Sequence, residues 1–141
     1  MGPRGPGPGG LAVLVVEDDP GVAALLADVL AGAGYAPTTT DSALGAVALA
    51  RRLHPAVVLL DLGLPYRSGG ALLGDLKADP ATAGVPVLVV SALAADLSPA
   101  RRALAAGVVA KPFSPGALLA AVRGAGARAA PPAPAARAPA P

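Results

Sequence analysis

Apolar residues occur along this chain in short unbroken runs that alternate with longer stretches of helical spacing. The runs lie at 11–16, 56–60, 85–90 and 108–110. Runs of this length are typical of strands buried on both faces, as in a parallel sheet covered by helices. A fifth segment, 35–40, is rich in threonine but contains Pro37. Because proline removes a donor from the hydrogen-bond ladder, we expect this strand at an edge of the sheet.

Between the runs, apolar positions recur with the spacing of one buried helical face. The first helix is predicted to begin after Asp19-Pro20, a favourable N-cap and first-turn pair, and to stop at Gly32. Strands and short-looped helices alternate five times, which predicts an α/β fold with right-handed crossovers and a parallel sheet. The other predicted helices run from Asp41 or Ser42 to about 53, from 69 to about 78, from Ser98-Pro99 to about 106 with Gly107 ending it, and onward from Ser114-Pro115.

The two ends of the 141-residue chain differ from its centre. Residues 1–10 and 128–141 consist mainly of glycine, proline and alanine and lack an apolar period, so we expect both to be disordered tails. The centre, 11–127, is long enough for one domain with a hydrophobic core.

Charge and composition exclude several classes of function. The formal net charge is +2, but Arg4, Arg128 and Arg137 lie in the predicted tails, and without these three the remainder is −1. The chain has only three aromatic residues and no room for a helix-turn-helix module, which argues against direct nucleic-acid binding. It contains no cysteine, no secretory leader and no apolar run of membrane-spanning length, so we expect a cytoplasmic protein with no membrane contact.

Polar residues follow the apolar runs at their carboxyl ends. In a parallel sheet these ends share one edge, which brings together Glu17, Asp18, Asp61, Ser91 and Lys111. Three carboxylates in one cleft repel one another unless a cation lies between them. Mg²⁺ suits such a site because it takes one or two carboxylates and keeps positions for water and phosphoryl oxygens; the Gly63 carbonyl would add a further oxygen.

This set of residues predicts phosphoryl chemistry centred on Asp61. A carboxylate can attack phosphorus and form an acyl phosphate. Lys111 would neutralise phosphoryl oxygens, and the Ser91 hydroxyl would donate to another. The single histidine, His54, precedes its strand and is therefore predicted to be exposed at the opposite edge.

These motifs resemble those of response-regulator receiver domains of two-component signalling. The resemblance covers about residues 11–125. It implies a flavodoxin-like, doubly wound (βα)5 fold with strand order 2-1-3-4-5. The matching residues are Glu17-Asp18, Asp61 in Leu-Leu-Asp-Leu-Gly-Leu-Pro, Gly69, Ser91-Ala92 and Lys111-Pro112-Phe113.

By this resemblance, Asp61 is the phosphoacceptor and takes a phosphoryl group from a sensor histidine kinase. Asp18, Asp61 and the Gly63 carbonyl would hold Mg²⁺, with Glu17 binding directly or through water, while Ser91 and Lys111 contact the phosphoryl group. The Lys111-Pro112 peptide would be cis. The chain would signal through a downstream protein or a phosphorelay and would catalyse only its own phosphorylation and dephosphorylation. The fourth helix, fifth strand and fifth helix would form the surface of a homodimer.

Two features depart from the family pattern. Val108 stands where receivers often carry a switch aromatic, and the segment between Ser91 and Lys111 is slightly short for the family. Separately, Gly63 stands in place of a bulkier or polar side chain and leaves the site open to water. The first departure keeps open a phosphorylation-independent interaction module on a receiver scaffold. Two other classes are disfavoured. A phosphohydrolase of the haloacid dehalogenase kind expects an aspartate where Gly63 stands, and a flavin protein of the same fold needs a Ser/Thr/Gly-rich phosphate loop, which this chain lacks after the first strand.

Tyr66 and Arg67 flank the predicted site and could either contact a partner or be ordinary loop residues.

Overall fold

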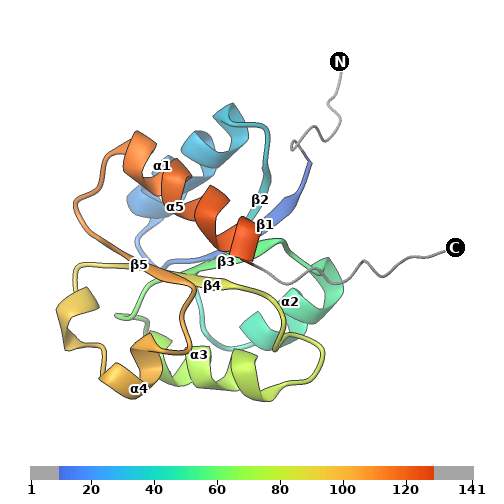
Figure 1. The fold of residues 1–141 in the computed structure, drawn as a ribbon, viewed down its shortest axis with the longest axis vertical. Helices are drawn as coiled ribbons and strands as arrows, with labels where there is room; N and C mark the ends of the chain where they lie inside the picture. Colours follow the sequence, from blue (N-terminus) through green and yellow to red (C-terminus); the bar gives the residue numbers. More distant parts are fainter. Residues whose placement is uncertain (1–9, 129–141) are drawn as a thin grey trace, which may run out of the picture.

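The computed structural model describes residues 10–128, which form one sheet with helices on both of its faces (Figure 1). The predicted disordered tails lie almost wholly outside the described residues. Within 10–128, no helix is both long enough and apolar enough to cross a membrane. The elements are β1 (Ala12–Val16), α1 (Pro20–Gly32), β2 (Ala36–Thr40), α2 (Ala46–Leu53), β3 (Val57–Leu60), α3 (Gly69–Ala78), β4 (Val87–Ser91), the 3₁₀ turn η1 (Ala94–Asp96), α4 (Pro99–Arg102), β5 (Gly107–Ala110) and α5 (Pro115–Arg128).

The sheet has five parallel strands in the order β2-β1-β3-β4-β5, which confirms the predicted fold class. β2, the strand that contains Pro37, lies at one edge as expected. β1, β3 and β4 occupy the centre, and nearly all their side chains are buried because helices cover both faces.

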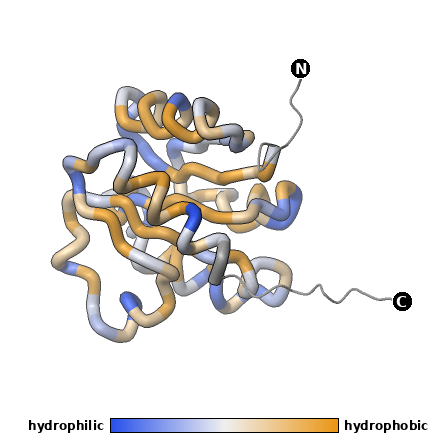
Figure 2. The backbone as a smooth tube through the Cα atoms, turned by 45° about the horizontal axis from the view of Figure 1, so that its top comes forward, coloured by the Kyte–Doolittle hydropathy of each residue, from blue (hydrophilic) through white to orange (hydrophobic). Residues whose placement is uncertain are grey.

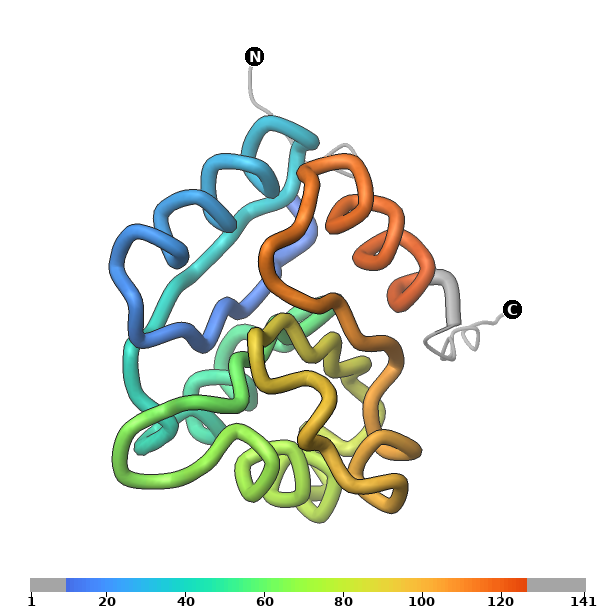
Figure 3. The backbone as a smooth tube through the Cα atoms, turned by 90° about the vertical axis from the view of Figure 1, so that its left-hand side faces the viewer, coloured from blue at the N-terminus to red at the C-terminus, as the bar shows by residue number. Residues whose placement is uncertain are grey.

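Alternate residues of the central strands enter two separate cores. Leu14, Val58 and Val89 point to the face covered by α2 and α3, whereas Val13, Leu59 and Val90 point to the face covered by α1 and α5. Figure 3 shows α1 and α5 on one side of the sheet and the other helices opposite. In Figure 2 the central strands are the most continuously hydrophobic part of the chain. The two-sided burial explains why these strands are apolar runs rather than alternating sequences.

Two helix boundaries differ from the prediction. α2 begins at Ala46, not at Asp41 or Ser42. Gly45 has φ of 80°, which is not helical, and the Ser42 Oγ accepts the Leu44 N–H to close a turn instead of capping a helix. The loop between β2 and α2 is therefore longer than predicted.

α4 is a single helical turn, Pro99–Arg102, and does not continue to about residue 106. The N–H groups of Leu104 and Ala105 bond to carbonyls three residues earlier, so the chain tightens and leaves the helix. Gly107 does not end a helix but begins β5, where it pairs with Leu88. A Cβ at Gly107 would approach Leu88 Cδ1 to 3.0 Å, which accounts for a glycine at this place in the sheet.

Candidate functional site

The predicted polar residues meet at the carboxyl edge of the sheet. Glu17 and Asp18 follow β1, Asp61 follows β3, Ser91 is the last residue of β4, and Lys111 follows β5. Glu17, Asp18 and Asp61 each offer a carboxylate oxygen, and these three oxygens lie within 4.8 Å of one another. His54 ends α2 before β3 begins, and it is exposed, as predicted.

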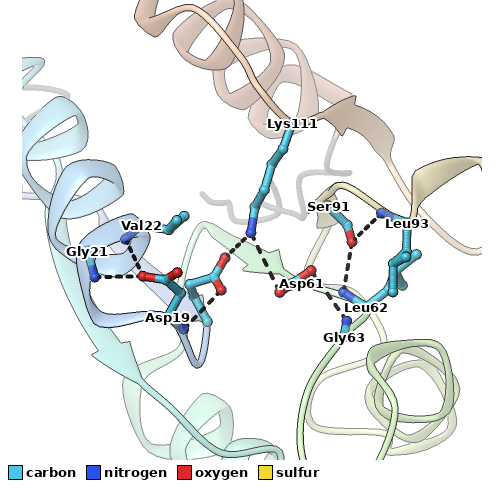
Figure 4. A network of polar contacts seen from close by, with 10 residues as sticks. Asp19, Gly21, Val22, Asp61, Leu62, Gly63, Ser91, Leu93 and Lys111 are labelled. Atoms are coloured by element: carbon cyan, nitrogen blue, oxygen red, sulfur yellow. Dashed lines mark hydrogen bonds and ion pairs between the residues drawn. The ribbon is translucent and has the colours of Figure 1, made fainter.

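Lys111 reaches from the end of β5 into the acidic cluster (Figure 4). Its Nζ lies 2.5 Å from Glu17 Oε1 and 3.6 Å from Asp61 Oδ2. The Lys111-Pro112 peptide is cis, as the resemblance implied. One cation therefore neutralises part of the charge of two carboxylates that come from different strands.

Glu17 is the buried member of the cluster, with 2% of its surface exposed. Burial raises the pKa of its carboxyl, although the hydrogen bonds from Lys111 and from the Asp19 N–H oppose this shift. The Asp19 N–H donates to Glu17 Oε2 over 3.2 Å. Glu17 is thus fixed by one partner at each oxygen, while Asp18 is exposed to solvent.

Asp61 is held ionised by its surroundings. Burial favours the neutral acid, but polar contact with Ser91, the charge of Lys111 and the Gly63 N–H outweigh it, and the pKa of Asp61 lies below its ordinary value. The Gly63 N–H lies 3.4 Å from Asp61 Oδ1. The Asp61 side chain, 11% exposed, is therefore charged at neutral pH and retains some contact with solvent.

Ser91 is completely buried beside Asp61. Its Oγ accepts the N–H of Leu93 over 3.1 Å and lies 3.4 Å from the N–H of Leu62. Both contacts use Oγ as the acceptor, which leaves the hydroxyl hydrogen free to point at Asp61. Ser91 thus connects the loops after β3 and β4 at the reactive carboxylate.

Sequence reasoning did not single out Leu93, which lies over the site. A Cβ built on Gly63 would lie 3.4 Å from Leu93 Cδ1, and 46% of Leu93 is exposed. The predicted opening at Gly63 is therefore partly occupied by this side chain. The only signal in the sequence is the position of Leu93 two residues after Ser91.

A cavity of about 640 Å³ opens beside the carboxylates, between α1 and the end of β2. Its polar lining comes from Glu17, Asp18, Thr39, Thr40 and Asp41, and alanines of α1 form the apolar part. The exposed Asp18 is thus reached from a space large enough for a small ligand or a partner's side chain.

Val108, at the position where the family often has an aromatic residue, is half-buried in β5. It packs against the core cluster on the α2 and α3 side of the sheet. Because valine has no aromatic ring, the rotation of an aromatic side chain that reports phosphorylation in many receivers cannot occur at this position.

The fold and these residues define a receiver domain. A family model for the response regulator receiver domain matches residues 13–123, and the chain belongs to this family. The match includes all five strands except the first residue of β1, together with the acidic cluster, Ser91 and Lys111.

Curated relatives agree with this assignment. Protein Rrf1 of Nitratidesulfovibrio vulgaris is 37% identical over 110 residues, which cover 78% of each chain. The DNA-binding response regulator MtrA of Mycolicibacterium smegmatis is 37% identical over 113 residues, which are 79% of this chain but 48% of MtrA. The chain thus spans about half the length of MtrA.

Solved structures agree as well. A sensor protein from Polaromonas sp. JS666 superposes with a TM-score of 0.80 at 30% identity, covering 84% of this chain and 98% of that one. The receiver domain of the sensor histidine kinase PA1611 from Pseudomonas aeruginosa PAO1 has a TM-score of 0.74 at 25% identity over the same shares of the two chains. That structure holds a magnesium ion in its active-site cleft.

Proposed function

We propose that this chain accepts a phosphoryl group on Asp61 from the phosphohistidine of a sensor histidine kinase. The observation that carries the proposal is the position of Lys111 Nζ, 2.5 Å from Glu17 and 3.6 Å from Asp61. At this position the Lys111 ammonium group would lie next to the oxygens of a phosphoryl group that is transferred to the ionised Asp61 carboxylate.

The reaction is a phosphoryl exchange between two side chains. An Asp61 carboxylate oxygen forms a bond to phosphorus while the bond from phosphorus to the donor imidazole nitrogen breaks. The imidazole keeps the electron pair of the broken bond, and a proton carried by its other ring nitrogen makes the leaving group neutral histidine. Lys111 compensates the charge on the phosphoryl oxygens, and the Ser91 hydroxyl donates a hydrogen bond to one of them.

The residues at the site fit Mg²⁺. The three carboxylate oxygens of Glu17, Asp18 and Asp61 lie within 4.8 Å of one another, and hard oxygen ligands are those that Mg²⁺ prefers. Since Glu17 is already bound to Lys111, Asp18 and Asp61 are the direct carboxylate ligands we propose, with Glu17 acting directly or through water and the Gly63 carbonyl adding an oxygen. When bound, Mg²⁺ supplies positive charge for the phosphoryl oxygens and lowers the repulsion between the carboxylates.

We further propose that the chain acts in the cytoplasm and signals through a downstream protein, with no catalysis beyond its own phosphorylation and dephosphorylation. A homodimer through α4, β5 and α5 belongs to the same proposal. Val108 supports one alternative, a module that binds its partner irrespective of phosphorylation. Equal partner affinity with and without the phosphoryl group would favour that alternative.

The test is phosphoryl incorporation from phosphoramidate, a small donor with the phosphorus–nitrogen bond of phosphohistidine. The wild-type chain is incubated with and without Mg²⁺ and compared with Asp61→Asn on a phosphate-affinity gel. Asp28→Asn, an exposed aspartate of α1, is the matched control. We expect an adduct that needs Mg²⁺ in the wild type and in the control, and none in Asp61→Asn. An equal adduct in Asp61→Asn, or no adduct in the wild type, would overturn the proposal.

A further inference from the structure

Tyr66 occupies an unusual backbone conformation in the loop between β3 and α3. Its φ is 69°, in the left-handed region that bulky side chains rarely adopt and that glycine or asparagine occupies at less cost. The side chain is 85% exposed. Of the three aromatic residues in the chain, Tyr35 and Phe113 are half-buried, so Tyr66 alone is exposed. Packing within the domain does not account for a tyrosine at this position.

Hydrogen bonds and an ion pair connect the loop to the rest of the domain around Tyr66. Arg67 Nε and Nη2 contact the two carboxylate oxygens of Asp75 over 2.5 and 2.7 Å, and the Arg67 N–H donates to the Pro65 carbonyl over 2.8 Å. The Gly69 N–H closes the loop onto the Leu62 carbonyl over 3.0 Å. An aromatic side chain on a fixed loop loses little conformational freedom when it binds, which favours it as an interface anchor.

Tyr66 also lies within reach of any protein that delivers a phosphoryl group to Asp61. Tyr66 is five positions after Asp61 in the chain, so their Cα atoms are at most about 18 Å apart. A donor protein must bring its phosphohistidine into bonding distance of Asp61, and a standard interface of about 800 Å² per partner extends roughly 16 Å from its centre. A donor interface centred on Asp61 therefore includes or borders Tyr66.

We propose that Tyr66 is the docking anchor for the phosphohistidine-bearing donor protein and determines which donor the chain accepts. The donor would present an apolar recess beside its phosphohistidine, into which the ring inserts. This inference rests on the proposed function of Asp61. A downstream protein could bind any face of the domain, whereas the donor must contact this edge of the sheet, which is why we assign Tyr66 to the donor.

The test separates protein donors from a small donor. Phosphoramidate labelling is measured first, and then transfer from the autophosphorylated cores of the sensor kinases encoded in the same genome. The variants are Tyr66→Gly, which removes the ring and suits the backbone conformation, and Tyr66→Phe, which keeps the ring. Leu11→Ala is the control, because Leu11 is 49% exposed and precedes β1 at the opposite edge of the sheet.

We expect Tyr66→Gly to lower the rate constant of transfer from the fastest kinase core at least about 10-fold. Labelling by phosphoramidate should change less than about 2-fold, and Tyr66→Phe and Leu11→Ala should transfer like the wild type. Transfer to Tyr66→Gly at the wild-type rate, or an equal loss in Leu11→Ala, would overturn the inference. The inference would also be overturned if phosphoramidate labelled Asp61 but none of the kinase cores transferred a phosphoryl group to the chain. Failure of the proposed function is distinct, because it shows as no phosphoramidate adduct at all.

Discussion

A side chain at Gly69 would collide with the backbone of Asp61, since a Cβ there would lie 2.0 Å from the Asp61 carbonyl oxygen. The first residue of α3 therefore packs directly on the chain that carries the reactive carboxylate. Ser68 caps the helix by accepting the Ala71 N–H over 3.1 Å, so the helix start and the site are positioned together.

We therefore expect Gly69→Ala to destabilise the domain by at least about 2 kcal/mol, because the contact is with backbone that cannot rotate away. Gly74→Ala is the control, since nothing lies within 4 Å of a Cβ at this helical position. That substitution should be neutral or stabilise by roughly 0.5–1 kcal/mol. Urea unfolding measures both, and a Gly69→Ala variant as stable as the wild type would contradict the packing described here.

Lys111 should oppose the binding of Mg²⁺ while it promotes phosphoryl transfer. Its Nζ is 3.6 Å from Asp61 Oδ2, and a cation bound by Asp61 would lie within about 6 Å of it. Repulsion at that distance in water is on the order of 1.4 kcal/mol, so Lys111→Met should bind Mg²⁺ about 10-fold more tightly.

Isothermal titration with Mg²⁺ measures the affinity, and phosphoramidate labelling should slow in the same Lys111→Met variant. Arg123→Met removes an exposed cation next to Leu11 and Ala56 at the opposite edge of the sheet, and it should change neither quantity. Weaker Mg²⁺ binding in Lys111→Met would show that the lysine organises the carboxylates rather than repelling the ion.

Ser91 should matter for both stability and phosphorylation. Ser91→Ala removes the acceptor of the part-buried Leu93 N–H, the buried contact with the Leu62 N–H and the contact with Asp61. This should cost about 1–3 kcal/mol and slow labelling. Ser114→Ala also removes a hydroxyl that accepts a backbone N–H, that of Ala117 at the start of α5. This control should cost about 1 kcal/mol and leave labelling unchanged. Labelling at the wild-type rate in Ser91→Ala would rule out a role for the hydroxyl in the reaction.

The ion pair between Arg67 and Asp75 should give the domain an acid-sensitive contribution to stability. Arg67 holds the pKa of Asp75 below its ordinary value of 3.8. A carboxyl with a lowered folded-state pKa stabilises the fold above its unfolded value, and this stabilisation is lost as pH falls through the folded value.

The free energy of unfolding of the wild type should therefore exceed that of Asp75→Asn above pH 3.8, with the difference shrinking at lower pH. Urea unfolding at a series of pH values measures it. Because both side chains are substantially exposed, high salt should reduce the difference at neutral pH. A difference that grows as pH falls would contradict this assignment.

Much of the fold was predictable because its signals are local. Apolar runs such as 56–60 are typical of strands buried on both faces, and Pro37 indicates an edge strand through its missing N–H. Alternating strands and helices then require a parallel sheet, whose carboxyl ends share one edge. The convergence of Asp61 and Lys111, fifty residues apart in the chain, follows from this topology.

Other features depended on contacts that no local pattern encodes. The short α4 and the late start of α2 were missed because capping residues mark where a helix can begin but not whether packing continues it. Leu93 over Gly63 and Arg67 against Asp75 join residues whose spacing carries no signal. The sequence alone therefore determined the strands, their burial and the edge on which the reactive residues lie. Only the tertiary structure decided which contacts these residues make with Asp61 and that Leu93 lies over Gly63, because side-chain contacts between separate segments depend on how the completed sheet and helices pack.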